Sequence, residues 1–127
     1  MTPESFESLV AEIGFSPVPE KFRALIKNVA LCVEEDVSQE TRHDMELPSD
    51  ETLLGLYRGI PLSARGDHYG GGTLPDTITI YQTPIERAAR EDGISVRQVI
   101  EETIWHEVAH HFGLDENEVR KREDERS

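Results

Sequence analysis

Two histidines four residues apart, His106 and His110, stand near the end of the chain in the stretch WHEVAHHFGLDE, and Glu107 directly follows the first. Residues spaced by four lie on the same side of an α-helix, about 6 Å apart along its axis, so both imidazoles can reach one ion. Imidazole is a common zinc ligand, and a carboxylate between two such ligands can take a proton from zinc-bound water. The spacing therefore predicts a zinc site, with His106 and His110 as ligands and Glu107 as the general base.

A third protein ligand is needed, and two acids follow the histidines, Asp115 and Glu116. In one unbroken helix Glu116 would lie about 9 Å beyond His110, which is too far to share an ion. Gly113 removes this obstacle because glycine readily takes a left-handed conformation that ends a helix and turns the chain back. Glu116 is preferred as the third ligand because Asp115 suits the capping position of a terminal helix, and Asp115 is the alternative.

The helix that carries the two histidines is expected over residues 96 to about 112, with Ser95 as its N-cap and Gly113 just past its end. Its inward face is taken from apolar residues of the first half, Val96, Val99 and Ile100, together with Thr103. On a wheel of about 100° per residue, both histidines and Glu107 fall on or beside that face. A buried carboxylate needs a compensating partner, which a metal and its bound water would provide.

Other residues near the motif have less specific roles. His111 also falls near the inward face, and it is expected to pack or to form a hydrogen bond rather than to bind metal. Trp105 and Phe112 are expected to pack in the core or between helices. His68 and Tyr69, in the loop GDHYGGG, could stabilise an oxyanion, but a plain surface loop is the preferred interpretation.

The rest of the chain predicts a small sheet with helices. Strands are expected at about 29–36, 53–59 and 77–82, and helices before residue 14, after Pro19 and at 85–92. In TITIY the residues alternate strictly, so Ile78 and Ile80 are expected to face the core and the threonines to face outward. We expect this strand to be the edge on which a peptide substrate can pair, with a central position, and 53–59 at the edge, as the alternative.

Composition limits the function classes. The 127 residues fit one domain, 1–127, and carry a formal net charge of −13, which argues against nucleic acid and against an anionic membrane surface. No signal peptide or membrane span is recognised, so the cytoplasm is the expected compartment. The single cysteine, Cys32, lies in an apolar run and is expected to be a small buried residue. The oligomeric state is left open, and a homodimer is one option.

Four stretches in order, NVALCVEED, LLGLYRGIPL, LPDTITIYQTPI and HEVAHHFGLDE, resemble the small bacterial zincin-like metallopeptidases, sometimes called minimal zincins. The resemblance covers nearly the whole chain. It implies an α+β zincin-like fold, with a small sheet of three or more strands packed against helices that include the zinc-motif helix. It also implies one Zn²⁺, held by His106, His110 and Glu116, and Glu107 as the catalytic base.

Two features depart from the family pattern. The third-ligand position, usually Asp or His, is occupied by Glu116, whose side chain is one methylene longer than Asp. No Met follows the motif, with only eleven residues after Glu116. The Met-turn of the larger metzincins is therefore not expected.

The leading hypothesis is a zinc-dependent peptidase that hydrolyses peptide or protein substrates with water activated by zinc and Glu107. The alternative from another class is a non-proteolytic binding or regulatory module, in which zinc is structural or absent. A zinc hydrolase acting on RNA is disfavoured by the charge and by Glu107. Glu107 separates the first two hypotheses because a structural site needs ligands but no base.

Overall fold

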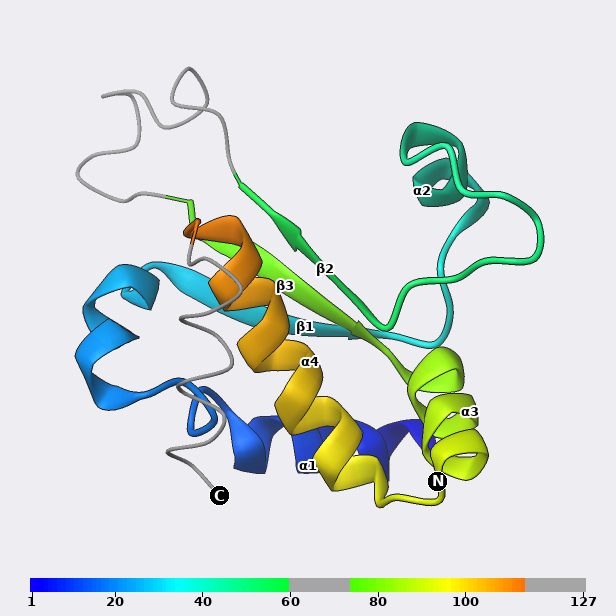
Figure 1. Ribbon diagram of the computed structural model, residues 1–127, viewed down its shortest axis with the longest axis horizontal. Coiled ribbons are helices and arrows are strands. Elements are labelled where there is room, and N and C mark those ends of the chain that lie inside the picture. Colours follow the sequence, from blue (N-terminus) through cyan, green and yellow to red (C-terminus); the bar gives the residue numbers. More distant parts are fainter. Residues whose placement is uncertain (60–73, 114–127) are drawn as a thin grey trace.

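The computed structural model describes residues 1–59 and 74–113, and it has an α+β architecture (Figure 1). Its sheet contains β1 (Val29–Glu34), β2 (Gly55–Arg58) and β3 (Asp76–Tyr81), in the order β1-β3-β2. Strand β1 is parallel to β3, whereas β2 is antiparallel to it. The expected α+β fold and three strands are thus confirmed, each strand starting or ending within two residues of its predicted bounds.

The predicted position of the TITIY strand in the sheet is wrong. Strand β3 is central, because it pairs with β1 on one side and with β2 on the other. Among the described strands, the edges are β1 and β2. Alternation along a strand reports which faces are covered, and it carries no information about neighbours in the plane of the sheet.

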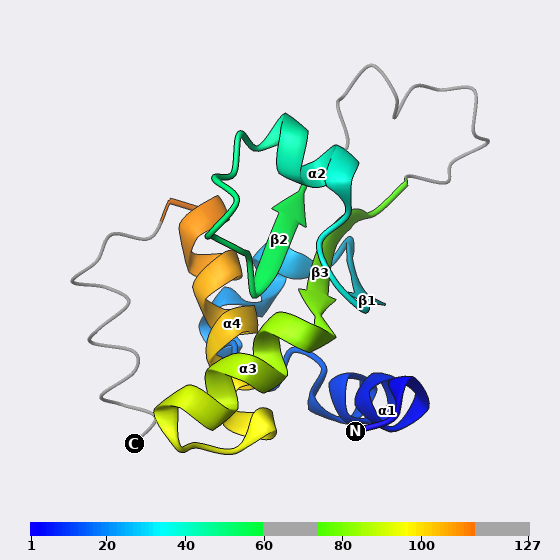
Figure 2. The ribbon, with the colours of Figure 1, turned by 90° about the vertical axis from the view of Figure 1, so that its right-hand side faces the viewer.

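Three of the helices in the described residues begin after a residue whose side chain caps them, namely Thr2, Ser38 and Ser95. Helix α1 (Pro3–Ile13) follows Thr2, whose hydroxyl accepts the N–H of Ser5, and ends at Gly14. A 3₁₀ helix, η1 (Glu20–Ile26), and two α-helices, α2 (Gln39–Asp44) and α3 (Gln82–Asp92), follow along the chain. Figure 2 shows α2 on one side of the strands and α1 with α3 on the other.

The long helix α4 (Val96–His111) starts as predicted, with the Ser95 hydroxyl accepting the N–H of Gln98 at 3.1 Å. Gly113 follows its end with φ of 71°, in the left-handed region expected for it. None of the helices within residues 1–59 and 74–113 is long and apolar enough to cross a membrane.

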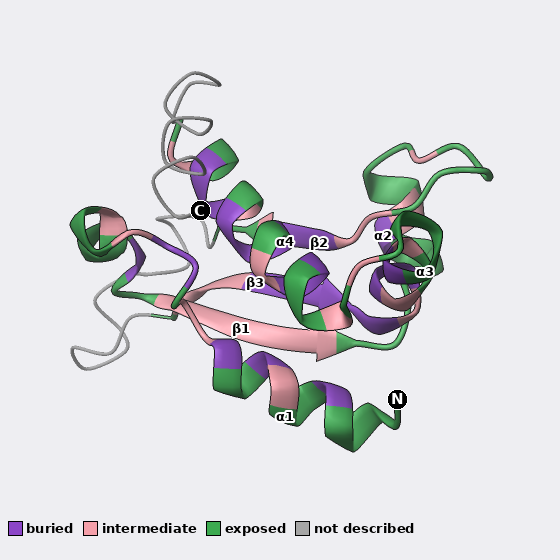
Figure 3. Ribbon diagram, turned by 60° about the horizontal axis from the view of Figure 1, so that its bottom comes forward, coloured by how far each residue is buried: buried purple, intermediate pink, exposed green. Residues whose placement is uncertain are grey.

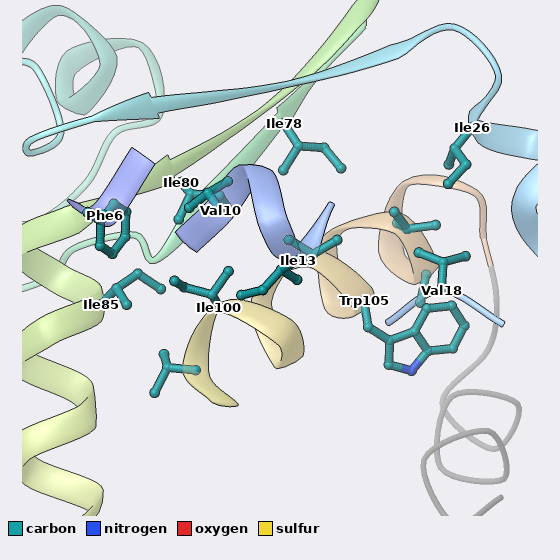
Figure 4. Packing of buried hydrophobic residues seen from close by; sticks show 14 of the residues in the cluster. Phe6, Val10, Ile13, Val18, Ile26, Ile78, Ile80, Ile85, Ile100 and Trp105 are labelled. Carbon is teal, nitrogen blue, oxygen red and sulfur yellow. The ribbon is translucent and has the colours of Figure 1, made fainter. Parts of the chain in front are cut away.

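The main core lies where α1 and α4 meet one face of the sheet (Figure 4). Ile78 and Ile80 of β3 are fully buried there, as predicted. Helices contribute further buried side chains to the same cluster: Phe6, Val10, Ile13, Ile85, Ile100, Ile104 and Val108. Each large aliphatic side chain buried in this way stabilises the fold by about 1.5–3 kcal/mol.

The opposite face of the sheet is also partly covered. Val37, Leu56 and Tyr81 form a second, smaller buried cluster. Thr79 is only 6% exposed, so the prediction that the threonines face outward is wrong for this residue. Arg58 donates to the Thr41 hydroxyl at 2.6 Å and ties α2 to β2.

Candidate metal centre

Both histidines of the predicted metal pair are exposed on α4, and Glu107 between them is half-buried. The prediction that all three point into the interior is therefore wrong for His106 and His110. Figure 3 shows buried and exposed segments alternating along this helix. Exposed imidazoles are open to an ion and to water, which a catalytic site needs and a core position would prevent.

The buried face of α4 turns along its length. In the first half it contains Val99, Ile100 and Thr103, the residues that defined the predicted wheel. In the second half it shifts to other positions: Ile104, Trp105, Val108 and Ala109. The cause is a second covering element, since Trp105 stacks on Phe22 of η1 with ring centroids 6.0 Å apart. The histidines consequently fall on the open side.

The carboxylate of Glu107 is held by a neighbouring strand. Its Oε1 accepts the backbone N–H of Tyr57 in β2 at 3.1 Å. Burial raises the pKa of Glu107, while the Tyr57 N–H and the positive charge of the nearby imidazoles act in the opposite direction. A carboxylate whose pKa is raised by burial is a stronger proton acceptor than a fully solvated one.

Strand β2 can approach α4 because residue 55 is glycine. A Cβ at Gly55 would meet Cγ2 of Thr103 at 2.8 Å and the backbone oxygen of Thr79 at 3.1 Å. Real Cβ atoms essentially never come within 3.0 Å of another heavy atom, so a side chain there would force the strand or the Thr103 side chain to shift. Gly55 thereby lets Glu107 reach the backbone of β2.

Tyr57 contacts several groups around the centre. Its N–H binds Glu107, its hydroxyl donates to Oδ2 of Asp76 at 2.8 Å, and its ring stacks on His111 with centroids 3.6 Å apart and planes 12° apart. His111 is packed rather than aligned with the metal pair, as expected. Phe112 meets both rings edge-on. Sequence reasoning missed Tyr57, because a tyrosine in a strand carries no motif of its own.

A pocket of about 380 Å³ opens beside Glu107 and His106. It lies between the segment leading into β2, the end of α3 and the middle of α4, three elements that Figures 1 and 2 both show close together. Its walls are mainly apolar, and they include Leu53, Ile94 and Val99. The predicted base therefore lies at the border of a concave surface large enough for a side chain of a substrate.

The predicted third ligand, Glu116, and its alternative, Asp115, lie outside the described residues, as do His68 and Tyr69. Within residues 1–59 and 74–113, no group of three His, Cys, Asp or Glu side chains is placed to hold a metal. The described part of the chain thus brings together two of the three predicted ligands, with the predicted base. Cys32 is half-buried on β1 and belongs to no such group.

The donor set present fits zinc. Two imidazoles one helical turn apart, on one continuous helix and exposed on the same side, match the nitrogen ligands that zinc prefers. The Tyr57 N–H binds the carboxylate of Glu107 and holds it at the strand. The two imidazoles can therefore bind the ion while Glu107 does not. Two imidazoles leave at least one protein position to be filled in a catalytic site of three ligands.

The fold and the helix-borne HExxH stretch together define a zincin-type α+β protein. The family profile described as zincin-like metallopeptidase matches residues 26–126, which is more than half of the chain. The chain therefore belongs to the zincin-like metallopeptidase family, as the sequence resemblance implied. No curated protein matches the chain. Zincins are in general zinc-dependent enzymes, so membership of this family supports a metallopeptidase role for the chain.

Proposed function

We propose that the chain is a zinc-dependent peptidase in which Glu107 is the general base and His106, His110 and Glu116 are the metal ligands. The observation that carries the proposal is the setting of Glu107. This carboxylate is half-buried, hydrogen-bonded to the backbone of β2, flanked by two exposed imidazoles and placed at the border of a pocket. A structural metal site would need the imidazoles but would have no use for such a base.

Zinc, when bound, would polarise the substrate carbonyl and lower the pKa of water. The residues of the chain would carry out the proton transfers and position the base. Glu107 would take the proton from water at its carboxylate and later deliver it to the departing amine. The Tyr57 N–H would hold the carboxylate at the border of the pocket while these transfers occur.

The outer edge of β2 is the proposed place for the peptide. The N–H of Tyr81 donates to the carbonyl of Leu54, so alternate residues from Leu54 onward face β3, and Gly55 and Tyr57 turn their polar groups the other way. That outer edge is the one from which Tyr57 reaches Glu107. An extended substrate laid along that edge would lie alongside the proposed base, with the Tyr57 N–H kept for Glu107.

The test separates metal binding from proton transfer. Glu107→Gln keeps the shape of the side chain but cannot accept the proton, so zinc content should stay while hydrolysis falls by about 10²–10⁴. His106→Ala should lose the zinc. His43→Ala is the matched control, since His43 is an exposed histidine on α2 with no proposed role. Zinc is measured by elemental analysis and hydrolysis by digestion of a broad peptide library.

Unchanged turnover in Glu107→Gln would exclude the base role, and equal zinc in wild type and His106→Ala would exclude the metal site. Stoichiometric zinc with no cleavage by any of the proteins would favour the non-proteolytic alternative. The expected peptide or protein substrate and the cytoplasmic location stay predictions.

A further inference from the structure

The pocket beside Glu107 combines an apolar floor with an acidic rim. Leu53, Ile94 and Val99 supply apolar surface, whereas Asp92 and Glu102 bring exposed carboxylates to the rim. Among the described residues that line the pocket, the charged side chains are all acidic, and His106 is the one further titratable group. The pocket thus offers burial to a hydrocarbon stem and attraction to a positive charge at its end.

The spacing along α4 matches a long side chain. Glu102 precedes Glu107 by five residues, which places its backbone about 7.5 Å farther toward the helix start. Asp92, the last residue of α3, lines the same pocket from the neighbouring helix. A residue bound beside Glu107 would therefore need a side chain of several carbons to reach the Glu102 carboxylate.

We propose that this pocket selects a lysine or arginine side chain next to the bond that is cut. This inference rests on the proposed peptidase function and adds a substrate class to it. Lysine and arginine bury their methylene stems along apolar surface while their charged ends stay near water and carboxylates. An acidic side chain would meet Asp92 and Glu102 as like charges, and a short one would leave the floor uncovered.

The rim carboxylates are exposed, so the effect of each one is modest. Exposed ion pairs change binding by about two- to fivefold each. Two carboxylates acting on one cation should therefore give a preference of about tenfold for lysine over norleucine, which has a side chain of similar length without the charge. A tenfold preference is large enough to measure. Because it comes from the two rim carboxylates, it should disappear when both are neutralised.

Equilibrium binding tests the pocket without requiring cleavage. The parent protein is zinc-supplemented Glu107→Gln, and the probes are fluorescent pentapeptides of glycine with lysine, norleucine or glutamate in the middle. The lysine peptide should bind about tenfold more tightly than the norleucine peptide, and the glutamate peptide more weakly than both. Adding Asp92→Asn and Glu102→Gln should bring lysine and norleucine to nearly equal affinity.

Two further variants serve as controls for the role of the rim carboxylates. Glu101→Gln removes a carboxylate from the neighbouring position of the same helix, outside the pocket lining, and should leave the lysine preference unchanged. Glu102→Lys places a cation on the rim and should shift the preference toward the glutamate peptide. Far-ultraviolet circular dichroism confirms that each variant is folded before its binding is compared.

The outcomes for the pocket and for the peptidase are distinct. Equal binding of lysine and norleucine peptides to the parent, or a lysine preference that survives loss of both rim carboxylates, would overturn the pocket assignment. Cleavage of library peptides by the wild type, abolished in Glu107→Gln, would at the same time support the proposed function. Lysine-selective binding without any cleavage by wild type would uphold the pocket and contradict the peptidase.

Discussion

At the residue scale, Tyr57 contributes to the centre through its backbone and through its side chain, and these contributions can be separated. Its N–H binds Glu107, while its hydroxyl binds Asp76. Tyr57→Phe should therefore keep the hold on Glu107 and the stacking on His111. It should lower the free energy of unfolding by about 1–2 kcal/mol, the worth of a hydrogen bond to a carboxylate at a partly exposed site.

Urea denaturation measures this loss, and the same preparations are assayed for zinc and for hydrolysis. Hydrolysis should change far less than in Glu107→Gln, because the backbone N–H is still present. A loss of hydrolysis as deep as that of Glu107→Gln would instead place the phenol itself in the chemistry.

Tyr81 is buried in the smaller core cluster, and its hydroxyl has no hydrogen-bond partner among the described residues. Burial raises the pKa of Tyr81 above its ordinary value of 10.0. A raised folded-state pKa of an acid means that its neutral form is favoured by folding. The contribution of the neutral Tyr81 phenol to stability is therefore present below pH 10 and is lost as pH rises through the folded-state pKa.

Tyr81→Phe should leave the free energy of unfolding unchanged or raise it by up to about 1 kcal/mol at pH 7, because it removes an unsatisfied polar group. The advantage of the phenylalanine variant should grow above pH 10, where it has no phenol to ionise. Urea melts at pH 7 and at about pH 10.5 measure both effects. A clear loss of stability at pH 7 would show that the hydroxyl has a partner.

At the element scale, the contact between β2 and α4 sets the distance from the strand to the base. Gly55→Ala should lower the free energy of unfolding by about 1–3 kcal/mol, since its Cβ would overlap Thr103 and Thr79. Thr103→Ser deletes the Cγ2 methyl and keeps the hydroxyl that donates to the carbonyl of Val99 at 2.7 Å. In the Thr103→Ser background, Gly55→Ala should cost less.

The double-mutant comparison is measured by chemical denaturation of all four proteins. Equal costs of Gly55→Ala in the two backgrounds would show that the Thr79 backbone, rather than the helix, is the barrier. Gly55→Ala should also weaken hydrolysis, because a displaced strand no longer places the Tyr57 N–H on Glu107.

Element type was predictable from sequence, and arrangement was not. Caps at Ser95 and Gly113 and the alternation in TITIY depend on local chemistry, so they could be read from the chain. The central place of β3 depends on β1 and β2, which come from elsewhere in the sequence. The predicted inward face of α4 was wrong for the same reason. Phe22 of η1, which is distant in the sequence, covers the second half of the helix by stacking on Trp105.

In the candidate site, too, the features set by neighbouring residues could be predicted, and those set by distant residues could not. The spacing of His106, Glu107 and His110 is local, so sequence alone could propose their roles. The partner of Glu107 was not accessible, because Tyr57 lies fifty residues away and acts through its backbone. No side-chain motif can report a backbone donor, and only the packing of β2 on α4 identifies it.

At the scale of the whole molecule, the dominant property is the net charge of −13, from 26 acidic against 13 basic side chains. Carboxylates in such excess repel one another in the folded state and weaken it. The same field attracts cations, and it is concentrated by the acidic rim of the pocket beside Glu107. One cause thus has two consequences, a cost in stability and an attraction for basic substrates, and salt should act on both.

Added salt should therefore change stability and cleavage in opposite directions. The Debye length falls from about 30 Å at 0.01 M salt to about 8 Å at 0.15 M, so repulsion across the molecule is screened and Tm should rise. Over the same range, kcat/KM for a lysine peptide should fall, while that for the norleucine peptide should change little. The variant carrying Asp92→Asn and Glu102→Gln should keep the gain in Tm but lose most of the salt dependence of lysine-peptide cleavage. Thermal melts and initial rates at matched NaCl concentrations measure both, and a parallel fall for both peptides would locate the salt effect away from the rim.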